Sequence, residues 1–437
     1  MRRGGTVGRW SDFQRRAQMD RAPSAPQHRC ASEVSCNRPP LPIVISQTTP
    51  IHFNMNSNSL FFVLFLTAAI KGSGADAPVL AQPPAIAAPP ARRGQAPTPV
   101  SSPDIQPDRR VTFRLRAPKA TEVVLAGQWA NGRAVMSKDT NGVWNVTTGP
   151  IEPGVYEYSF QVDGLSMIDP GNSAIKPMRQ PRTSILHLPG RPPLLHDFQQ
   201  VPHGTVHQHT YHSKSLDRQR ELAVYTPPGY ERQPEARFPT LYLQHGAGDN
   251  EATWVVHGKA HWIIDNLIAQ GRAKPMVIVM MDGHTAIASG GAAGFQNNTG
   301  LFERDLIDDV LPFIETNYRV KTEAVGRGIV GLSMGGGQSL AIGLNHADRF
   351  AWVGGFSSAV PSGESIDSAL KNPATNEKLK LLWIGCGKDD FLLKRNEDFI
   401  ALLKEKNVHY EWHLSDGGHS WPVWRIYLAE LAPKLFR

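Results

Sequence analysis

The alternation of two kinds of segment over residues 201–437 restricts the possible fold more than any other feature of this chain. Short apolar runs such as "TLYLQHG", "MVIVMMDG" and "KLLWIGCG" predict strands, and the longer stretches between such runs predict helices: "GKAHWIIDNLIAQG", "FERDLIDDVLPFIETNY" and "NEDFIALLKEKN". Strands that alternate with helices form βαβ units and a mostly parallel sheet. The continuous apolar run "MVIVMM" indicates that helices cover both faces of this sheet. We therefore expect an α/β domain over residues 201–437.

A second group of short runs, over residues 105–188, predicts a small all-β domain. "VTFRLRAP", "EVVLAG", "GVWNVTTG" and "GVYEYSFQVDG" alternate apolar and polar residues between turn residues, as the strands of a β-sandwich do. In "YEYSFQV" the side chains of Tyr156, Tyr158, Phe160 and Val162 share one face, because side chains alternate along a strand. We expect that face to form the core of the sandwich.

The run "GVWNVTTGPIEPGVYEYSFQVDG" ahead of "DPGN" resembles the early-set, glycogen-binding-like modules at the amino end of many carbohydrate-active enzymes. Trp129 and Trp144 have two possible roles in such a module. They either pack in its core, which is the more common role, or stack on sugar rings, whose apolar faces suit aromatic side chains.

The residues ahead of the sandwich do not have the pattern of a folded domain. An apolar stretch from Leu60 to Ile70 is followed by small residues, as in a secretory signal peptide, and is too short to span a bilayer. The alternative is a buried or disordered apolar segment. We expect a secreted or periplasmic protein that starts near Met55 and has no stable membrane insertion. The predicted segments outside the two domains are a non-structural extension (1–54), a signal peptide (55–81), an Ala/Pro-rich linker (82–104) and a second linker (189–200).

The charge and cysteine content exclude two further classes of protein. The net charge is +7, but residues 1–54 contain eight Arg against three acidic residues and so contribute +5 of it. A nucleic-acid partner requires basic residues clustered on a folded face, so we expect none. Cys30 and Cys36 lie in the predicted extension, which leaves Cys386 alone and allows no disulfide framework. We expect Cys386 to pack inside its strand.

The run "GIVGLSMGGG" places Ser333 at the end of a strand and ahead of a predicted helix. Gly-x-Ser-x-Gly at such a junction is the nucleophile-elbow pattern, in which a tight turn between small residues exposes the hydroxyl. A serine hydroxyl needs a base and an acid to become a nucleophile, and in this fold class the chain order is serine, acid, histidine. Downstream, "KLLWIGCGKDDFL" offers Asp389 and Asp390 at a strand end, and "HLSDGGHSWPVW" offers His419 in a glycine-containing loop.

Five ordered motifs, "LYLQHGAGDNEATW", "GLSMGGG", "GCGKDDFL", "GGHSWPVWR" and "LAPKLF", resemble the esterase-D-like family of α/β-hydrolases. Within it they are most similar to the ferulic acid and acetylxylan esterases of carbohydrate esterase family 1, some of which are appended to xylanases. The resemblance covers residues 201–437. It implies that Ser333 is the nucleophile, His419 the general base, and Asp390, rather than Asp389, the acid that orients the histidine. Asp416, in the histidine's own loop, is expected to cap a turn instead.

The same resemblance implies a binding site for the oxyanion and a pocket for the acyl group. The backbone N–H groups of Met334 and Ala247 are the expected oxyanion donors. His245 is expected to support the loop that carries Ala247. The expected pocket residues are the aromatic residues near the motifs, with Trp421 foremost: Trp421, Trp254 and Phe295, with Trp424 close by. For all of these except Trp421, packing in the core is the alternative and the more common role.

The histidine-rich run "HGTVHQHTYH" is suggestive of a metal site. His207 and His209 would share a strand face, but no nearby acid or cysteine completes a ligand set with them or with His203 and His212. The serine mechanism needs no metal. We therefore expect a solvated strand where the two domains meet, no metal and no cofactor.

These observations predict a serine esterase that removes feruloyl or acetyl groups from plant-type polysaccharide through an acyl-enzyme on Ser333. Its substrate would be a polysaccharide-linked or small ester; the sequence leaves the oligomeric state open. Three alternatives remain: an enzyme for another acyl donor (a siderophore ester, a thioester or acyl transfer), a xylanase-class glycosidase, and a non-catalytic carbohydrate-binding protein. A glycosidase needs two carboxylates beside a sugar cleft, whereas the acids here follow the hydrolase pattern.

Overall fold

The computed structural model describes residues 100–285 and 291–437. The predicted extension (1–54), the signal-peptide-like segment (55–81) and most of the Ala/Pro-rich linker (82–104) lie outside these residues. Within the described ranges, no helix combines the length and the apolar character that crossing a bilayer requires.

The amino-terminal part of the described chain is a sandwich of two antiparallel sheets. One sheet has the strand order β1–β2–β6–β5, with bounds β1 Asp104–Ile105, β2 Val111–Arg116, β6 Val143–Thr148 and β5 Ser137–Lys138. The other has the order β4–β3–β7–β8, with β4 Arg133–Val135, β3 Val123–Gly127, β7 Gly154–Val162 and β8 Leu165–Met167, and β9 (Ser184–Leu188) also pairs with β7. The predicted all-β module is confirmed.

The core of the sandwich contains the predicted face of β7. Tyr158 and Phe160 are fully buried in it, and Tyr156 and Val162 pack against it. Of the two roles open to the tryptophans, the structure selects core packing. The ring of Trp129 stacks on Phe113, with centroids 5.5 Å apart, and the indole N–H of Trp144 donates to the carbonyl oxygen of Ala117 at 2.9 Å. Both rings are buried and are therefore not free to stack on a sugar.

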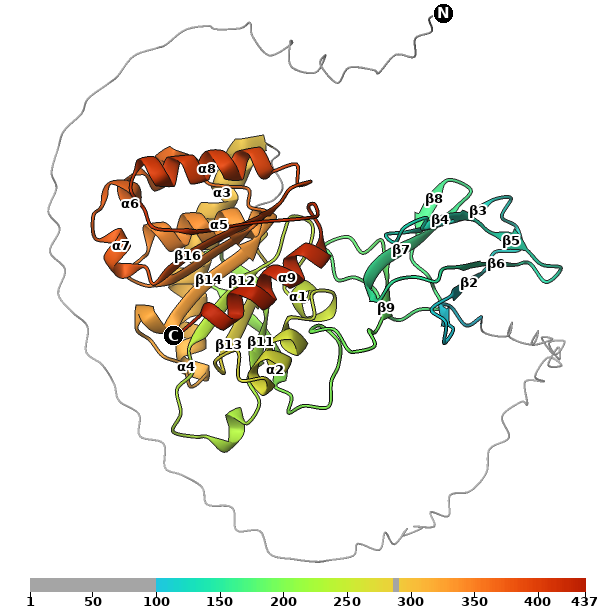
Figure 1. Cartoon of the computed structure of the whole chain (residues 1–437), viewed down its shortest axis with the longest axis horizontal. Coiled ribbons are helices and arrows are strands. Elements are labelled where there is room, and N and C mark those ends of the chain that lie inside the picture. The colour runs from blue at the N-terminus through green and yellow to red at the C-terminus, as the bar shows by residue number, and fades with distance from the viewer. Residues whose placement is uncertain (1–99, 286–290) are drawn as a thin grey trace, which may run out of the picture. The chain divides into compact units, whose positions relative to one another are not determined.

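The carboxyl-terminal part contains an eight-stranded sheet flanked by helices, as predicted (Figure 1). Its strand order is β10–β11–β13–β12–β14–β15–β16–β17, in which β10, β11 and β13 pair antiparallel and all other neighbours are parallel. The bounds are β10 Thr205–Ser213, β11 Arg218–Thr226, β12 Thr240–Gln244, β13 Val277–Met281, β14 Arg327–Leu332, β15 Trp352–Phe356, β16 Leu381–Gly387 and β17 Glu411–Ser415. This is the doubly covered, mostly parallel sheet of an α/β-hydrolase domain.

Two separate cores cover the two faces of this sheet. Helices α2 (Ala260–Ala269) and α9 (Trp421–Leu431) contribute to one, and α3 (Gly291–Arg304), α5 (Ser333–Asn345) and α8 (Leu393–Glu405) contribute to the other. Consecutive strand residues such as Ile329 and Val330 belong to opposite cores. This explains why the central strands are apolar at nearly every position. The shorter helical elements are α1 Thr253–Val256, α6 Asp367–Lys371, α7 Thr375–Lys378, η1 Tyr230–Arg232, η3 Ala324–Gly326, η4 Gly363–Ile366 and η5 Ala432–Lys434.

The segment predicted as one helix over residues 302–318 is helical throughout most of its length but not regular. α3 ends at Arg304, a π-helical segment (η2, Asp305–Val310) follows, and α4 spans Leu311–Asn317. Pro312 has no backbone N–H, so the regular ladder of α-helical hydrogen bonds cannot continue across it. The prediction of a helical stretch is confirmed, with a π-helical segment in its middle.

Candidate active site

Ser333 lies at the sharp turn between β14 and α5. Its φ of 53° is in the left-handed region, which a residue other than glycine adopts at a cost. The flanking residues must be small: a Cβ on Gly331 would collide with the backbone of Gly335, and a Cβ on Gly335 would collide with the carbonyl oxygen of His245. The strained turn therefore depends on the glycines of the Gly-x-Ser-x-Gly pattern.

We expect Gly335→Ala to lower the free energy of unfolding by about 2–3 kcal/mol, because backbone atoms must move to admit the methyl group. Urea unfolding of the purified variant measures this. Gly300→Ala is the matched control: a Cβ at Gly300, in α3, meets nothing within 4 Å. It should raise stability by up to about 1 kcal/mol, since alanine favours helices. Equal stability of the two variants would contradict the proposed crowding at the elbow.

Ser333, His419 and Asp390 form a continuous hydrogen-bonded chain. The Nε2 atom of His419 lies 3.0 Å from the Oγ of Ser333, and its Nδ1 lies 3.0 and 3.1 Å from the two carboxylate oxygens of Asp390. Since the carboxylate accepts the Nδ1 hydrogen, Nε2 is free to accept the serine proton. The three residues follow β14, β16 and β17, whose carboxyl ends lie at one edge of the sheet because these strands run parallel through β15.

Asp390 is the acid that reaches the histidine, and its surroundings keep it ionised. Burial by itself raises the pKa of this carboxyl group, but hydrogen bonds from His419, from Ser357 and from the backbone N–H of Leu392 (2.8 Å) hold the pKa below its ordinary value. The side chain is completely buried. A buried carboxylate that stays charged can stabilise a positive charge on the neighbouring imidazole.

The two competing acids lie elsewhere. Asp389 is exposed to solvent, and the contact recorded for it there is a hydrogen bond from its backbone N–H to the carbonyl oxygen of Gly417. Asp416 is exposed too, and its carboxylate pairs with Lys388 at 2.8 Å. The geometry therefore separates Asp390 from both.

Both predicted oxyanion donors lie near Ser333. Met334 is in the first turn of α5, where backbone N–H groups have no acceptor within the helix. Ala247 lines the same pocket as Ser333 and His419, and a Cβ on the adjacent Gly246 would lie 3.4 Å from the Cβ of Ser333. Their roles as donors stay predictions, but their positions suit them.

The loop that carries Ala247 rests on the buried His245, as predicted. The N–H of Gly283 donates to Nε2 of this histidine at 2.9 Å, so Nδ1 carries the hydrogen and donates to the carbonyl oxygen of Gly246 at 2.8 Å. His245 thus ties the loop after β12 to the loop after β13.

A pocket of about 620 Å³ opens at the triad. Its walls come from both domains. The α/β-hydrolase domain contributes Gly246, Ala247, Asp249, Ser333, Phe391, His419, Ser420, Trp421, Pro422 and Trp424, and the sandwich contributes Gln128, Tyr156, Glu157, Lys176, Met178 and Arg182.

Of the three aromatic residues predicted for this pocket, the structure places one there. Trp421 lines it, as does Trp424, whose ring lies edge-on to that of His419 with centroids 5.0 Å apart. Of the two roles open to Trp254, the structure selects core packing: its side chain is buried against Trp421 and donates to the carbonyl oxygen of Gln244 at 3.0 Å. Phe295 belongs to α3, but its side chain lies outside the described residues.

Sequence reasoning missed Phe391 and the whole sandwich wall. The Phe391 side chain is 76% exposed, and its ring centroid lies 4.5 Å from that of His419. Its position directly after Asp390 was the available signal. For the sandwich residues no signal existed, because nothing in their local sequence pattern shows which distant loop they contact.

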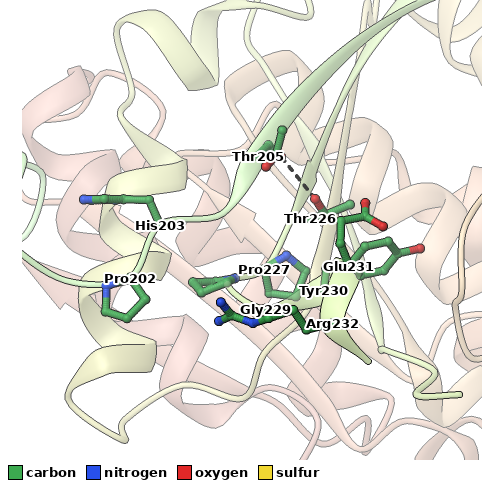
Figure 2. Close-up of a pocket in the computed structure, with 10 residues that line it drawn as sticks. Pro202, His203, Thr205, Thr226, Pro227, Gly229, Tyr230, Glu231 and Arg232 are labelled. Atoms are coloured by element: carbon green, nitrogen blue, oxygen red, sulfur yellow. Dashed lines mark hydrogen bonds between the residues drawn. The ribbon is translucent and has the colours of Figure 1, made fainter. Parts of the chain in front are cut away.

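A second pocket, of about 330 Å³, lies where β10 begins and β11 ends (Figure 2). Because β11 is antiparallel to β13, with Tyr225 opposite Ile278, this is the sheet edge opposite Ser333. Figure 2 shows the hydrogen bond between Thr226 and Thr205 that closes it on one side. His203 has both ring nitrogens engaged, with Asp265 and with the carbonyl oxygen of Gln199, each at 2.9 Å. No serine or cysteine is among the described residues that line this pocket.

The histidine-rich run forms the edge strand β10, and its side chains have protein partners. His207 and His209 share a face, as predicted, with near-parallel rings 6.4 Å apart, and contact Thr226 and Tyr318. Across residues 100–285 and 291–437, no three His, Cys, Asp or Glu side chains are grouped as metal ligands. Cys386 is buried in β16, as predicted, and burial raises the pKa of its thiol to about 12.

Two family models match the chain in the order of its two domains. The family described as "Putative esterase" matches residues 213–435, and the family described as carbohydrate-binding module 48 (isoamylase N-terminal domain) matches residues 101–177. The similar curated proteins include an endo-1,4-beta-xylanase/feruloyl esterase of Xylanibacter ruminicola, 33% identical over 332 residues. That match covers 74% of this chain and 44% of the relative, so this chain spans less than half of that protein's length.

Two solved structures show the same fold. A ferulic acid esterase of Anaeromyces mucronatus, solved with ferulic acid, is 23% identical and has a TM-score of 0.50, over 55% of this chain and 93% of that one. An enterobactin esterase of Shigella flexneri is 18% identical and has a TM-score of 0.53, over 74% of this chain and 92% of that one. At these identities the likeness concerns the fold.

Proposed function

This chain belongs to the esterase family that matches residues 213–435, and from that premise we propose that it removes feruloyl groups, or alternatively acetyl groups, from plant-type polysaccharide. The observation that carries the proposal is the hydrogen-bonded chain of Ser333, His419 and Asp390 at the floor of a pocket. The proposal includes export through the signal-peptide-like segment near Met55.

The geometry supports a two-step acyl transfer. In the first step Nε2 of His419 takes the proton of Ser333 while Oγ attacks the ester carbonyl carbon, and the N–H groups of Met334 and Ala247 donate hydrogen bonds to the developing oxyanion. His419 then protonates the leaving alcohol and the acyl group stays on Ser333. In the second step His419 takes a proton from water, which attacks the acyl carbon, and then gives that proton to the leaving Oγ of Ser333 as the acid is released. The charged Asp390 stabilises the imidazolium in both steps.

The pocket walls favour a flat aromatic acyl group. Tyr156, Phe391, Trp421 and Trp424 surround the space beside Ser333, and a volume of about 620 Å³ far exceeds the size of an acetyl group. Aromatic walls bind planar rings by stacking and edge contacts. The Xylanibacter ruminicola relative is an endo-1,4-beta-xylanase/feruloyl esterase, which agrees with this choice.

The glycosidase alternative receives no support from the acids in the pocket. The carboxylates of Glu157 and Asp249 both line it, but each lies 3.1 Å from the same atom, Nζ of Lys176. A glycosidase needs one acid that can give up a proton and a second carboxylate on the other side of the scissile bond. Here both carboxylates instead share one lysine as an ion-paired cluster.

Hydrolysis of methyl ferulate beside p-nitrophenyl acetate by the purified chain tests the proposal, with Ser333→Ala as the blank. We expect release of ferulate, because the aromatic walls hold the acyl group next to Ser333. Turnover of the acetate alone would replace the feruloyl proposal with deacetylation. No turnover of either ester would reject both and favour another acyl donor or a non-catalytic, carbohydrate-binding protein.

A further inference from the structure

One lysine of the sandwich, Lys176, reaches the loop that carries the predicted oxyanion donor. It lies between β8 and β9, is 6% exposed, and its Nζ lies 3.1 Å from Glu157 Oε1 and 3.1 Å from Asp249 Oδ1. Glu157 is a residue of β7 in the sandwich, whereas Asp249 lies two residues after Ala247 in the α/β-hydrolase domain. The lysine therefore joins the two domains at the edge of the active site.

The residues just after Lys176 also form hydrogen bonds with the loop that carries Ala247. The N–H of Arg179 donates to the carbonyl oxygen of Gly248 at 3.0 Å, and the hydroxyl of Thr253 donates to the carbonyl oxygen of Pro177 at 2.7 Å. Together with the ion pair to Asp249, these bonds hold the segment that follows Ala247 at three points. Gly248 itself has a φ of 84°, a conformation that favours glycine, and its N–H donates to Nε2 of His284 at 3.0 Å.

The ion pair explains why the loop would move without the lysine. Asp249 is almost completely buried, and burial raises the pKa of its carboxyl group while Lys176 acts against that rise. A buried carboxylate without its partner is strongly unfavourable, so the loop would turn Asp249 toward water or the group would take up a proton. Either change removes a fixed point two residues from Ala247.

A second set of contacts joins the sandwich to α9, the helix that begins two residues after His419. Arg425 of α9, the helix that follows His419, donates to the carbonyl oxygens of Val155 in the sandwich (3.4 Å) and of His257 (3.0 Å). The Nζ of Lys176 lies 5.8 Å from the centre of the Trp421 ring at the start of that helix. The helix that follows the His419 loop thus also contacts the sandwich.

We propose that Lys176 is a positioning residue that holds the Ala247 backbone donor in place, so that the sandwich is part of the catalytic centre. This inference rests on the proposed esterase activity. It concerns turnover of the ester itself and is independent of any contact that the sandwich makes with polysaccharide.

The test is Lys176→Met in the full chain, assayed on methyl ferulate and p-nitrophenyl acetate, neither of which carries a sugar. Displacement of a catalytic group by about 1 Å costs up to about 100-fold, so kcat should fall about 10- to 100-fold with KM changed less than about threefold. Lys138→Met is the matched control. Lys138 also belongs to the sandwich and lies over a tryptophan ring, that of Trp144 at 5.1 Å, but is not among the residues that line the pocket. The kcat of Lys138→Met should match that of the parent chain.

Asp249→Asn keeps the shape of the side chain and removes the other half of the ion pair. It is the second test variant, to be used if Lys176→Met does not fold. It should lower kcat to a similar extent, and the double variant should be no slower than the slower single variant, because both act through one contact. A parent-like kcat for Lys176→Met, a change confined to KM, or effects that multiply in the double variant would overturn the inference. In each of those cases the parent is active. An inactive parent would instead reject the proposed function.

Discussion

Ser333→Ala is expected to lower kcat for ester hydrolysis by about 10⁶-fold relative to the parent chain. The hydroxyl of Ser333 is the group that His419 Nε2 contacts at 3.0 Å, and alanine leaves no atom to attack the carbonyl carbon or to hold the acyl group. The residual rate of the variant comes from direct attack by water on the bound ester, which oxyanion stabilisation and substrate binding still accelerate. Initial rates on methyl ferulate and p-nitrophenyl acetate measure the loss, and a burst of product at high enzyme concentration should disappear with it.

Two controls show whether the loss is specific to the nucleophile. Ser365→Ala removes an exposed serine hydroxyl that bonds only locally, to the carbonyl oxygen of Ser362, and should leave kcat unchanged. Binding of xylan fragments, where the parent shows it, should be untouched in Ser333→Ala, since the substitution removes a single oxygen. If Ser333→Ala retained more than about 1% of the parent's turnover, the assignment of the nucleophile would be wrong.

The second large effect is expected at the acid: Asp390→Asn should lower kcat by about 10⁴-fold. An amide in this position cannot stabilise the imidazolium, and its N–H favours the tautomer of His419 in which Nε2 carries the hydrogen and cannot accept the proton of Ser333. The fold should survive, because asparagine has the same shape and can still accept the N–H of Leu392. Steady-state kinetics together with the melting temperature separate the catalytic loss from any loss of stability.

The neighbouring residue provides the control. Asp389→Asn changes an exposed side chain that makes no contact with His419 in the described structure, and we expect its kcat to stay within about twofold of the parent's. A larger loss in Asp389→Asn than in Asp390→Asn would reverse the assignment. The comparison is decisive because the two variants differ only in which of two adjacent carboxylates is neutralised.

The α/β-hydrolase fold and the position of Ser333 were accessible from the sequence because their signals are local. Apolar runs such as "MVIVMM" reflect burial on both faces of the sheet, and the glycines around Ser333 reflect collisions within one turn. The chain order of Ser333, Asp390 and His419 follows from parallel strands that end at one edge. The core face of β7 was predicted for a similar reason, since alternation along a strand depends only on the strand itself.

The choice between adjacent or similar side chains needed the tertiary structure. Asp389 and Asp390 follow the same strand, and only the packing around His419 turns one inward and leaves the other in water. Trp254 and Trp421 both lie near active-site motifs, yet one is buried beneath the other.

The sequence by itself determined the sheet and the elbow at Ser333, since each depends on periodicity or on a turn within a few residues, whereas the packing around His419 decided between Asp389 and Asp390. Only the tertiary structure decided that the sandwich forms a wall of the active site. Lys176 and Asp249 are far apart in the chain and carry no shared pattern; their ion pair exists because the two domains pack together and bury both charges.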